Sequence, residues 1–312
     1  MNLDPEMAAY LASSGNAMRA LGLPSPDPPP DIERDFHERL NLATRTDPLP
    51  MAEVADCWIE ARGRRIFCRV YRPLATEVLP LIVYFHGGGW YLCSVDTHDC
   101  VARLLASEGR AVVVSVDYAR SPEARFPQAL EECAAVAAHI ATHNTDLRVD
   151  GSRMVLAGDS AGGTLALGAA LLFRDRCGPA LRGVFAAYPI CDSNQNTDSY
   201  RKYATGLPLT ADKMAFFWRH YVRQPTDMLD PLTAPVRADL RGLPPIFLSI
   251  AELDVLCSEG VALADKLAAA GVEVKCEVIN GLTHGFMRAT ASVTKAREAA
   301  TRVGNWLRDV LA

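Results

Sequence analysis

From residue 57 onward, short apolar segments alternate with longer segments in which apolar residues recur every three or four positions. The short segments have the length of β-strands. The run 79–85 (Leu-Pro-Leu-Ile-Val-Tyr-Phe) contains almost only apolar residues, as expected of a strand buried on both faces. We predict strands at residues 57–61, 65–71, 79–85, 111–116, 154–157, 183–188, 246–250 and 272–278.

Helical patterns separate these strands. They cover residues 97–107, 127–143, 161–174, 258–270 and 294–310. The first two strands are joined by Arg62-Gly63-Arg64, which predicts a hairpin. Strands that alternate with helices specify the α/β class, here a mostly parallel sheet of eight strands with helices on both faces.

Two segments do not follow this alternation. In residues 1–45, Asp4-Pro5 predicts the start of a helix. A proline cluster at 24–30 ends that helix, and Ile32, Phe36 and Leu40 indicate a second one. Two short helices bury little surface by themselves, so we expect them to pack on the main body as part of a cap.

The second exceptional segment, residues 192–242, is longer than a simple crossover requires. Its residues Met214, Phe217, Trp218 and Tyr221 would share one face of a helix. An ordinary core helix would explain them, but the segment follows a strand at the carboxyl edge of the sheet, which favours a lid. We therefore expect cap helices at 1–45 and a catalytic domain at 46–312 with a cap insertion at about 192–242.

The composition sets broad limits on the function. The chain has 312 residues, of which 49% are hydrophobic and 22% charged, which is ordinary for a soluble globular protein and excludes a disordered chain or a fibre. No apolar run reaches the ~18 residues of a membrane span. Acidic residues near the start, where a signal peptide is basic, lead us to expect a cytoplasmic protein. The net charge of −5 and the dispersed basic residues do not suggest nucleic-acid binding.

None of the nine cysteines forms a C-x-x-C pair, so the sequence does not suggest a zinc site. Their odd number and irregular spacing favour free thiols.

The strongest chemical signal is Gly158-Asp159-Ser160-Ala161-Gly162, which fits G-x-S-x-G between a predicted strand and a predicted helix. In this context the serine is a candidate nucleophile on a tight turn. An ordinary glycine-rich turn is the alternative. A second signal, His86-Gly87-Gly88-Gly89-Trp90, follows the apolar strand 79–85. Its backbone N–H groups suit an oxyanion hole, with Ala161 as a further donor. We expect His86 itself to be structural.

The candidate base is His284, because it follows the predicted strand 272–278 on a short loop. The candidate acid is Asp254, after the strand 246–250, with Glu252 as its competitor. The order Ser160, Asp254, His284 is the chain order of α/β-hydrolases.

These motifs resemble those of the bacterial hormone-sensitive-lipase-like esterases (family IV) in the α/β-hydrolase superfamily. The resemblance runs from about residue 59 to the C-terminus and includes the HGGG and GDSAGG motifs, the acid loop and the histidine loop. The stretch 121–128 is most similar to the acetyl-esterase branch. Val255 and Ser258 depart from the usual acid loop, and Thr164 stands where the family often has Asn. The family builds its cap from an N-terminal helical segment and an insertion, which the resemblance places at 1–45 and 192–242.

The resemblance and the motifs together imply a serine carboxylesterase that acts through an acyl-enzyme. Ser160, Asp254 and His284 would be catalytic, and Gly87, Gly88 and Ala161 would form the oxyanion hole. No metal or organic cofactor is required. Two alternatives remain: an amidase or arylformamidase with the same triad, and a non-catalytic small-molecule receptor of the same fold, which the presence of His284 disfavours.

The expected substrate is a water-soluble ester with a short-to-medium acyl chain, and we expect neither nucleic acid nor membrane as a partner. Two interpretations stay open for the helix 294–310: a homodimer contact, as in some dimeric relatives, or packing on the sheet. Core packing is an equal alternative for each aromatic residue that we consider as a pocket wall, namely Trp90, Tyr91, Phe217, Trp218 and Phe286.

Overall fold

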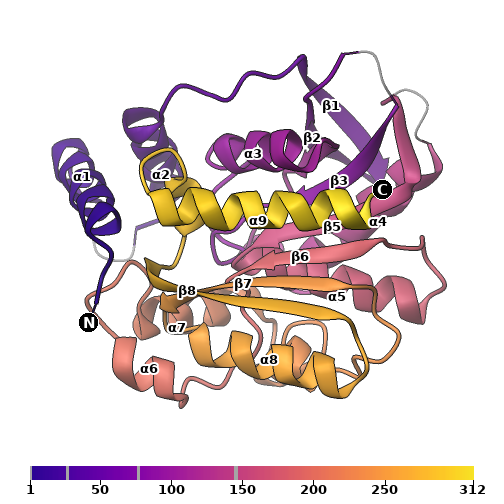
Figure 1. Cartoon of the computed structure of the whole chain (residues 1–312). Helices are drawn as coiled ribbons and strands as arrows, with labels where there is room; N and C mark the ends of the chain where they lie inside the picture. The colour runs from indigo at the N-terminus through magenta and orange to yellow at the C-terminus, as the bar shows by residue number, and fades with distance from the viewer. Residues whose placement is uncertain (1, 26–27, 76–77, 144–146) are drawn as a thin grey trace.

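The computed structural model describes residues 2–25, 28–75, 78–143 and 147–312. Within these residues one eight-stranded sheet has the order β1-β2-β4-β3-β5-β6-β7-β8 (Figure 1). The pairs β1–β2 and β2–β4 are antiparallel, and all later neighbours are parallel. The predicted mostly parallel α/β sheet is therefore confirmed. The strands are β1 Glu53–Ala61, β2 Arg64–Arg72, β3 Leu79–Phe85, β4 Val112–Val116, β5 Val149–Asp159, β6 Gly183–Ala187, β7 Ile246–Leu253 and β8 Val274–Thr283.

The central strands lie where their apolar runs predict them. Several strands at the margins of the sheet, or with polar ends, are longer than predicted. β5 begins five residues before the predicted start. Its first two residues, Val149 and Asp150, pair with Leu79 and Pro80, and the register then shifts before Leu81. The β1–β2 hairpin turns at two residues, Arg62 and Gly63, which both have positive φ. Such a turn matches the right-handed twist of the two strands.

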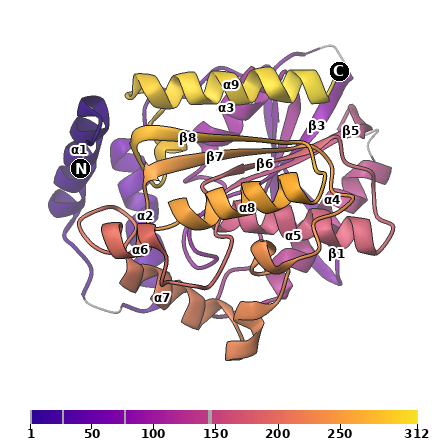
Figure 2. The same ribbon diagram turned by 60° about the horizontal axis from the view of Figure 1, so that its bottom comes forward.

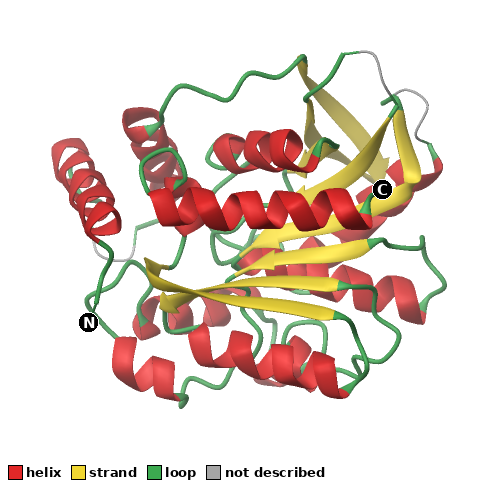
Figure 3. Cartoon of the chain, viewed as in Figure 1, coloured by secondary structure: helices red, strands yellow, loops and turns green. Residues whose placement is uncertain are grey.

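Helices cover both faces of the sheet (Figure 3). On one face lie α3 (Asp99–Gly109) and α9 (Thr294–Val310). On the other lie α4 (Gln128–Thr142), α5 (Ala161–Asp175) and α8 (Cys257–Ala269). The apolar residues of α9, such as Val303 and Leu307, are buried against α3 and the sheet, so this helix uses its apolar face within the chain.

The two segments outside the strand–helix alternation lie together at the end of the sheet where the parallel strands finish (Figures 1 and 2). The first holds α1 (Pro5–Leu21) and α2 (Pro30–Thr44), and the second holds α6 (Asp198–Tyr203) and α7 (Ala211–Tyr221). Asp4 caps α1 by accepting the N–H groups of Glu6 and Met7, as expected. Residues 26–27 of the proline cluster lie outside the described residues. Short 3₁₀-helices occur at Pro225–Leu229, Pro235–Arg237 and Phe286–Ala289.

The helices α3 and α9 cross very closely at Gly304. A Cβ atom at this position would lie 2.5 Å from the Glu108 Cβ and 3.0 Å from the Glu108 carbonyl oxygen. We expect Gly304→Ala to lower the free energy of unfolding by about 1–3 kcal/mol in urea titrations, because the two helices must move apart. This loss would occur although alanine favours an isolated helix by up to about 1 kcal/mol.

The matched control for this substitution is Gly15→Ala in α1, where the nearest atoms to a new Cβ are Arg19 guanidinium nitrogens at 3.7 Å and 3.9 Å. This variant should be as stable as the parent chain or slightly more stable. Equal behaviour of the two variants would contradict a steric limit at the α3–α9 crossing.

Candidate active site

Ser160 occupies a sharp turn between the end of β5 and the start of α5, as the G-x-S-x-G context predicts. Its backbone has φ 53° and ψ −123°, a strained conformation for a residue with a side chain. The turn depends on its flanking glycines, because a Cβ at Gly158 would lie 2.2 Å from the Gly162 carbonyl oxygen, and one at Gly162 would lie 1.9 Å from the Phe85 carbonyl oxygen. The strain and the two close approaches together hold the serine at the carboxyl edge of the sheet.

The structure brings His284 and Asp254 to this serine. His284 Nε2 lies 2.9 Å from Ser160 Oγ, and His284 Nδ1 lies 2.6 Å from Asp254 Oδ2. Asp254 directly follows β7 and His284 directly follows β8, so neighbouring parallel strands deliver them to the same edge. If Nδ1–H donates to the carboxylate, Nε2 is left to accept the Ser160 O–H.

The competing acid, Glu252, is engaged elsewhere. Its Oε2 atom accepts the Gly281 N–H at 2.7 Å, which ties β7 to β8. Asp254 is almost fully buried, and its second oxygen, Oδ1, accepts the Leu256 N–H at 3.1 Å. This arrangement fixes the carboxylate that faces His284.

The glycine loop departs from expectation at one position. The Gly87 N–H, which we expected to point at an oxyanion, donates to Asp159 Oδ1 at 2.9 Å. In this arrangement the Gly87 N–H already has a protein acceptor, which argues against its predicted role as an oxyanion donor. Within the part of the chain that the structure describes, the N–H groups of Gly88, Gly89 and Ala161 have no protein acceptor.

Asp159 anchors the loop as a buried anion. Its Oδ1 also accepts the Tyr84 hydroxyl at 2.6 Å, and His98 Nε2 lies 3.5 Å from Oδ2. Burial alone would raise the pKa of this carboxyl, but His98, the hydrogen bond from Tyr84 and the nearby His86 outweigh it and lower the Asp159 pKa to about 2. The motif gives no sign that Asp159, at the variable position of G-x-S-x-G, anchors the glycine loop.

His86 has the surroundings of a structural side chain. It is fully buried, its Nδ1 lies 2.8 Å from the Gly87 carbonyl oxygen, and its ring stacks on Tyr118 at 4.4 Å. The Tyr118 hydroxyl donates to the His86 carbonyl oxygen at 2.7 Å. Burial lowers the pKa of His86 to about 3, so the ring is neutral near pH 7. These contacts hold the first residue of the loop.

All five candidate wall residues are buried. Trp90 stacks on Tyr221 with ring centres 3.9 Å apart and also packs on Trp218, while Phe286 lies against Tyr188 on the other face of the sheet. These contacts favour core packing for Trp90, Trp218 and Phe286. Phe217 differs, because its ring lies directly against Gly89 in the glycine loop. Another residue that the sequence did not indicate, Tyr188, places its ring 4.7 Å from the ring of His284.

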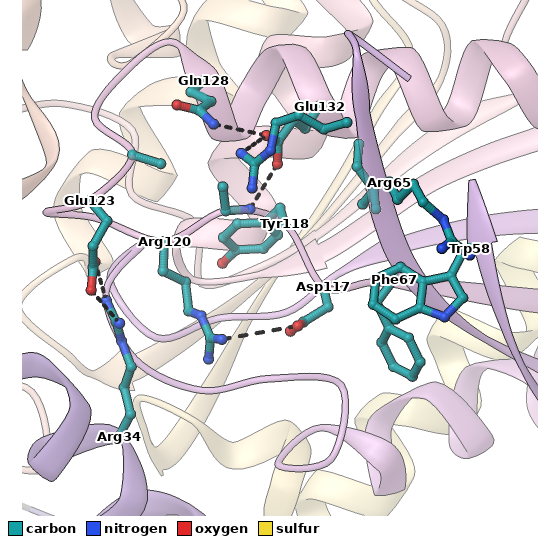
Figure 4. A pocket seen from close by; sticks show the side chains of 14 residues that line it. Arg34, Trp58, Arg65, Phe67, Asp117, Tyr118, Arg120, Glu123, Gln128 and Glu132 are labelled. Carbon is teal, nitrogen blue, oxygen red and sulfur yellow. Dashed lines mark hydrogen bonds and ion pairs between the residues drawn. The ribbon is translucent and has the colours of Figure 1, made fainter. Parts of the chain in front are cut away.

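A surface cavity of about 370 Å³ lies away from the triad, between the β1–β2 hairpin and the residues that follow β4 (Figure 4). Six of its seven charged side chains form ion pairs: Arg34 with Glu123, Arg120 with Asp117, and Arg64 with Glu132. The seventh, Arg65, lies over the Trp58 ring. Because most of these charges are already paired, we assign this cavity no part in the chemistry.

Among the described residues, no group of three or more His, Cys, Asp or Glu side chains could hold a metal ion. The nine cysteines have free thiols in the structure. None of the helices in the described ranges is long and apolar enough to cross a membrane.

Comparisons with known proteins bear on the fold and on the class of enzyme. A family model described as the α/β-hydrolase fold matches residues 82–288. Carboxylesterase NlhH of Mycobacterium tuberculosis is 38% identical over 239 residues, which cover 75% of each chain. Ethyl acetate hydrolase of Pseudomonas putida is 31% identical over 97% of this chain and 98% of that protein.

Solved structures extend the match to the whole fold. The crystal structure of a thermostable esterase from Pseudomonas putida superposes with a TM-score of 0.93 at 33% identity, and the match covers 100% of this chain and 98% of that one. These relatives are named as a carboxylesterase, an ethyl acetate hydrolase and an esterase, and the family model spans most of the sheet of this chain. The chain is a carboxylic ester hydrolase and belongs to the hormone-sensitive-lipase-like family of the α/β-hydrolase fold.

Proposed function

We propose that the protein is a serine carboxylesterase that hydrolyses esters with short-to-medium acyl chains through an acyl-enzyme. The observation that carries the proposal is the continuous chain of hydrogen-bond distances from Asp254 through His284 to Ser160, 2.6 Å and 2.9 Å. His284 takes the proton of Ser160 as the oxygen attacks the ester carbonyl, and Asp254 stabilises the imidazolium that forms. The tetrahedral intermediate collapses as the imidazolium gives its proton to the leaving alcohol, which leaves the acyl group on Ser160. Water that His284 activates then attacks this acyl-enzyme, and the acid departs as the proton returns to Ser160.

The oxyanion of the tetrahedral intermediate would accept N–H groups of the glycine loop and of Ala161. We propose Gly88, Gly89 and Ala161 as donors, since the Gly87 N–H is engaged by Asp159. Ala161 is the first residue of α5, so its N–H lies at the positive end of the helix dipole. Backbone donors that are fixed before the reaction need no reorganisation as the negative charge develops.

We also propose that residues 1–45 and 192–242 act as a cap over Ser160. Their helices lie at the carboxyl end of the sheet (Figure 2), and Ser160 is only 6% exposed. A nucleophile that is so little exposed suits esters with small acyl groups. The name of one relative, ethyl acetate hydrolase, supports a short acyl group for this chain as well.

The first test is hydrolysis of p-nitrophenyl esters from acetyl to dodecanoyl by the parent chain and by Ser160→Ala. We expect the short esters to turn over and the variant to lose at least about 10⁴-fold in kcat, because the nucleophile is gone. A parent chain that is inactive on every ester but cleaves an anilide would replace the proposal with an amidase. Ligand binding without turnover of either substrate would replace it with a receptor.

The second test concerns the anchor of the glycine loop. Asp159→Ala removes the acceptor of the Gly87 N–H, so the oxyanion donors lose their position. We expect kcat on the acetyl ester to fall by about 10²–10³-fold with a smaller change in KM, as for the loss of an oxyanion donor. Tyr84→Phe is the matched control, because it removes a hydrogen bond to the same carboxylate and leaves the loop bond intact. Equal kcat losses in the two variants would argue against loop positioning.

A further inference from the structure

The helices α2 and α7 approach the same loop, residues 89–94, from different parts of the chain (Figure 2). α7 packs on it with aromatic side chains. A Cβ placed on Gly89 would lie 2.3–2.4 Å from three carbons of the Phe217 ring, so this ring already fills the space above the glycine. Trp218 packs on Trp90, and Phe216 packs edge-on against Tyr91 at 5.1 Å.

α2 holds the loop through polar contacts. The Arg34 guanidinium donates to the Tyr91 carbonyl oxygen at 2.8 Å and to the Ser121 carbonyl oxygen at 2.7 Å. The same guanidinium forms a two-point ion pair with Glu123. One of these four contacts reaches the loop itself, and the other three reach Ser121 and Glu123. Together they fix the position of α2, to which other parts of the cap can then attach.

One ion pair joins the two helices to each other. Lys213 Nζ of α7 lies 2.5 Å from Glu33 Oε1 of α2, across 180 residues of sequence. The Glu33 side chain is 9% exposed and the Lys213 side chain 33%. Lys213 Nζ also lies 4.5 Å from the ring centre of Phe216 and 5.2 Å from that of Phe217. The lysine thus links the carboxylate of α2 to the aromatic face of α7.

The opposite end of α7 has its own anchor. Arg125, outside both cap segments, donates to the carbonyl oxygens of Arg219 and Val222. Phe217 lies between these two anchors, four residues after Lys213 and two residues before Arg219. Loss of the Lys213 contact would therefore free the first turn of α7 and remove the lysine that packs against the Phe217 ring.

We propose that the Glu33–Lys213 ion pair is a latch that holds Phe217 over Gly89 and thereby limits the length of the acyl chain. The inference rests on the proposed esterase function. An ester whose carbonyl oxygen reaches the N–H groups of Gly88 and Gly89 has its substituents within a few bonds of Gly89. Phe217 is a cap side chain in contact with that glycine, so its position limits the length of the acyl chain that the site can accommodate. Lys213 and Glu33 are positioning residues and touch no substrate.

The test compares kcat/KM for octanoyl and acetyl p-nitrophenyl esters in the parent chain and in Lys213→Met. Methionine keeps an apolar contact with the two phenylalanine rings but removes the charge. We expect the octanoyl-to-acetyl ratio to rise about fivefold or more, a change typical of altered room for a few methylene groups. The acetyl rate should stay within about twofold. Arg219→Met is the matched control, because it removes one positive charge from an exposed position on the same helix and leaves the ratio unchanged.

Two further variants keep the test decisive if Lys213→Met folds poorly because Glu33 is left buried without its partner. Glu33→Gln combined with Lys213→Met leaves no unpaired charge and should raise the ratio in the same way. The exchange Glu33→Lys with Lys213→Glu restores an ion pair and should return the ratio toward that of the parent chain.

Phe217→Ala should also raise the ratio, and Lys213→Met should add little to it, because both changes act on the same ring. A folded Lys213→Met or double variant with the parent's ratio overturns the latch while the esterase function stands. A parent chain without Ser160-dependent ester hydrolysis instead overturns the proposed function.

Discussion

The site depends on one close approach of two backbones. The turn that carries Ser160 comes so near to the end of β3 that a single methyl group at Gly162 would overlap the Phe85 carbonyl oxygen. Because β3 and β5 are adjacent parallel strands, their carboxyl ends deliver the glycine loop and the nucleophile to the same point. The Asp159–Gly87 hydrogen bond then joins the residue before the nucleophile to the loop, so the two catalytic parts hold each other in place.

Much of this arrangement could be predicted from the sequence. The central strands are continuous apolar runs. Such a run, as at residues 79–85, is typical of a parallel strand that is buried on both faces. The close approach of Ser160, Asp254 and His284 follows from their positions directly after strands, since parallel strands bring their carboxyl ends together. The extra length of some strands was not predicted, because their polar residues, such as those at the start of β5, pair through the backbone and leave no apolar pattern in the sequence.

The sequence left the arrangement open where one atom has two suitable partners or one residue type has two uses. The motif indicates that glycine N–H groups are available, but the engagement of the Gly87 N–H depends on where the Asp159 carboxylate lies. Aromatic residues such as Trp90 and Phe286 suit a pocket wall and a packed interior equally well, and only the three-dimensional contacts distinguish them. The pairing of Glu33 with Lys213 has no sequence signal, because it joins two helices far apart in the chain.

The low pKa of Asp159 has a consequence for how the enzyme responds to acidity. A carboxyl with a pKa of about 2 keeps its negative charge across the range in which enzymes are normally assayed. His86, with a pKa of about 3, keeps its neutral form across most of that range. Asp159 and His86 therefore keep the same charge when the pH is lowered mildly from neutrality. A loss of turnover on such acidification would not come from a change of charge at either of these two groups, which hold the first residues of the glycine loop.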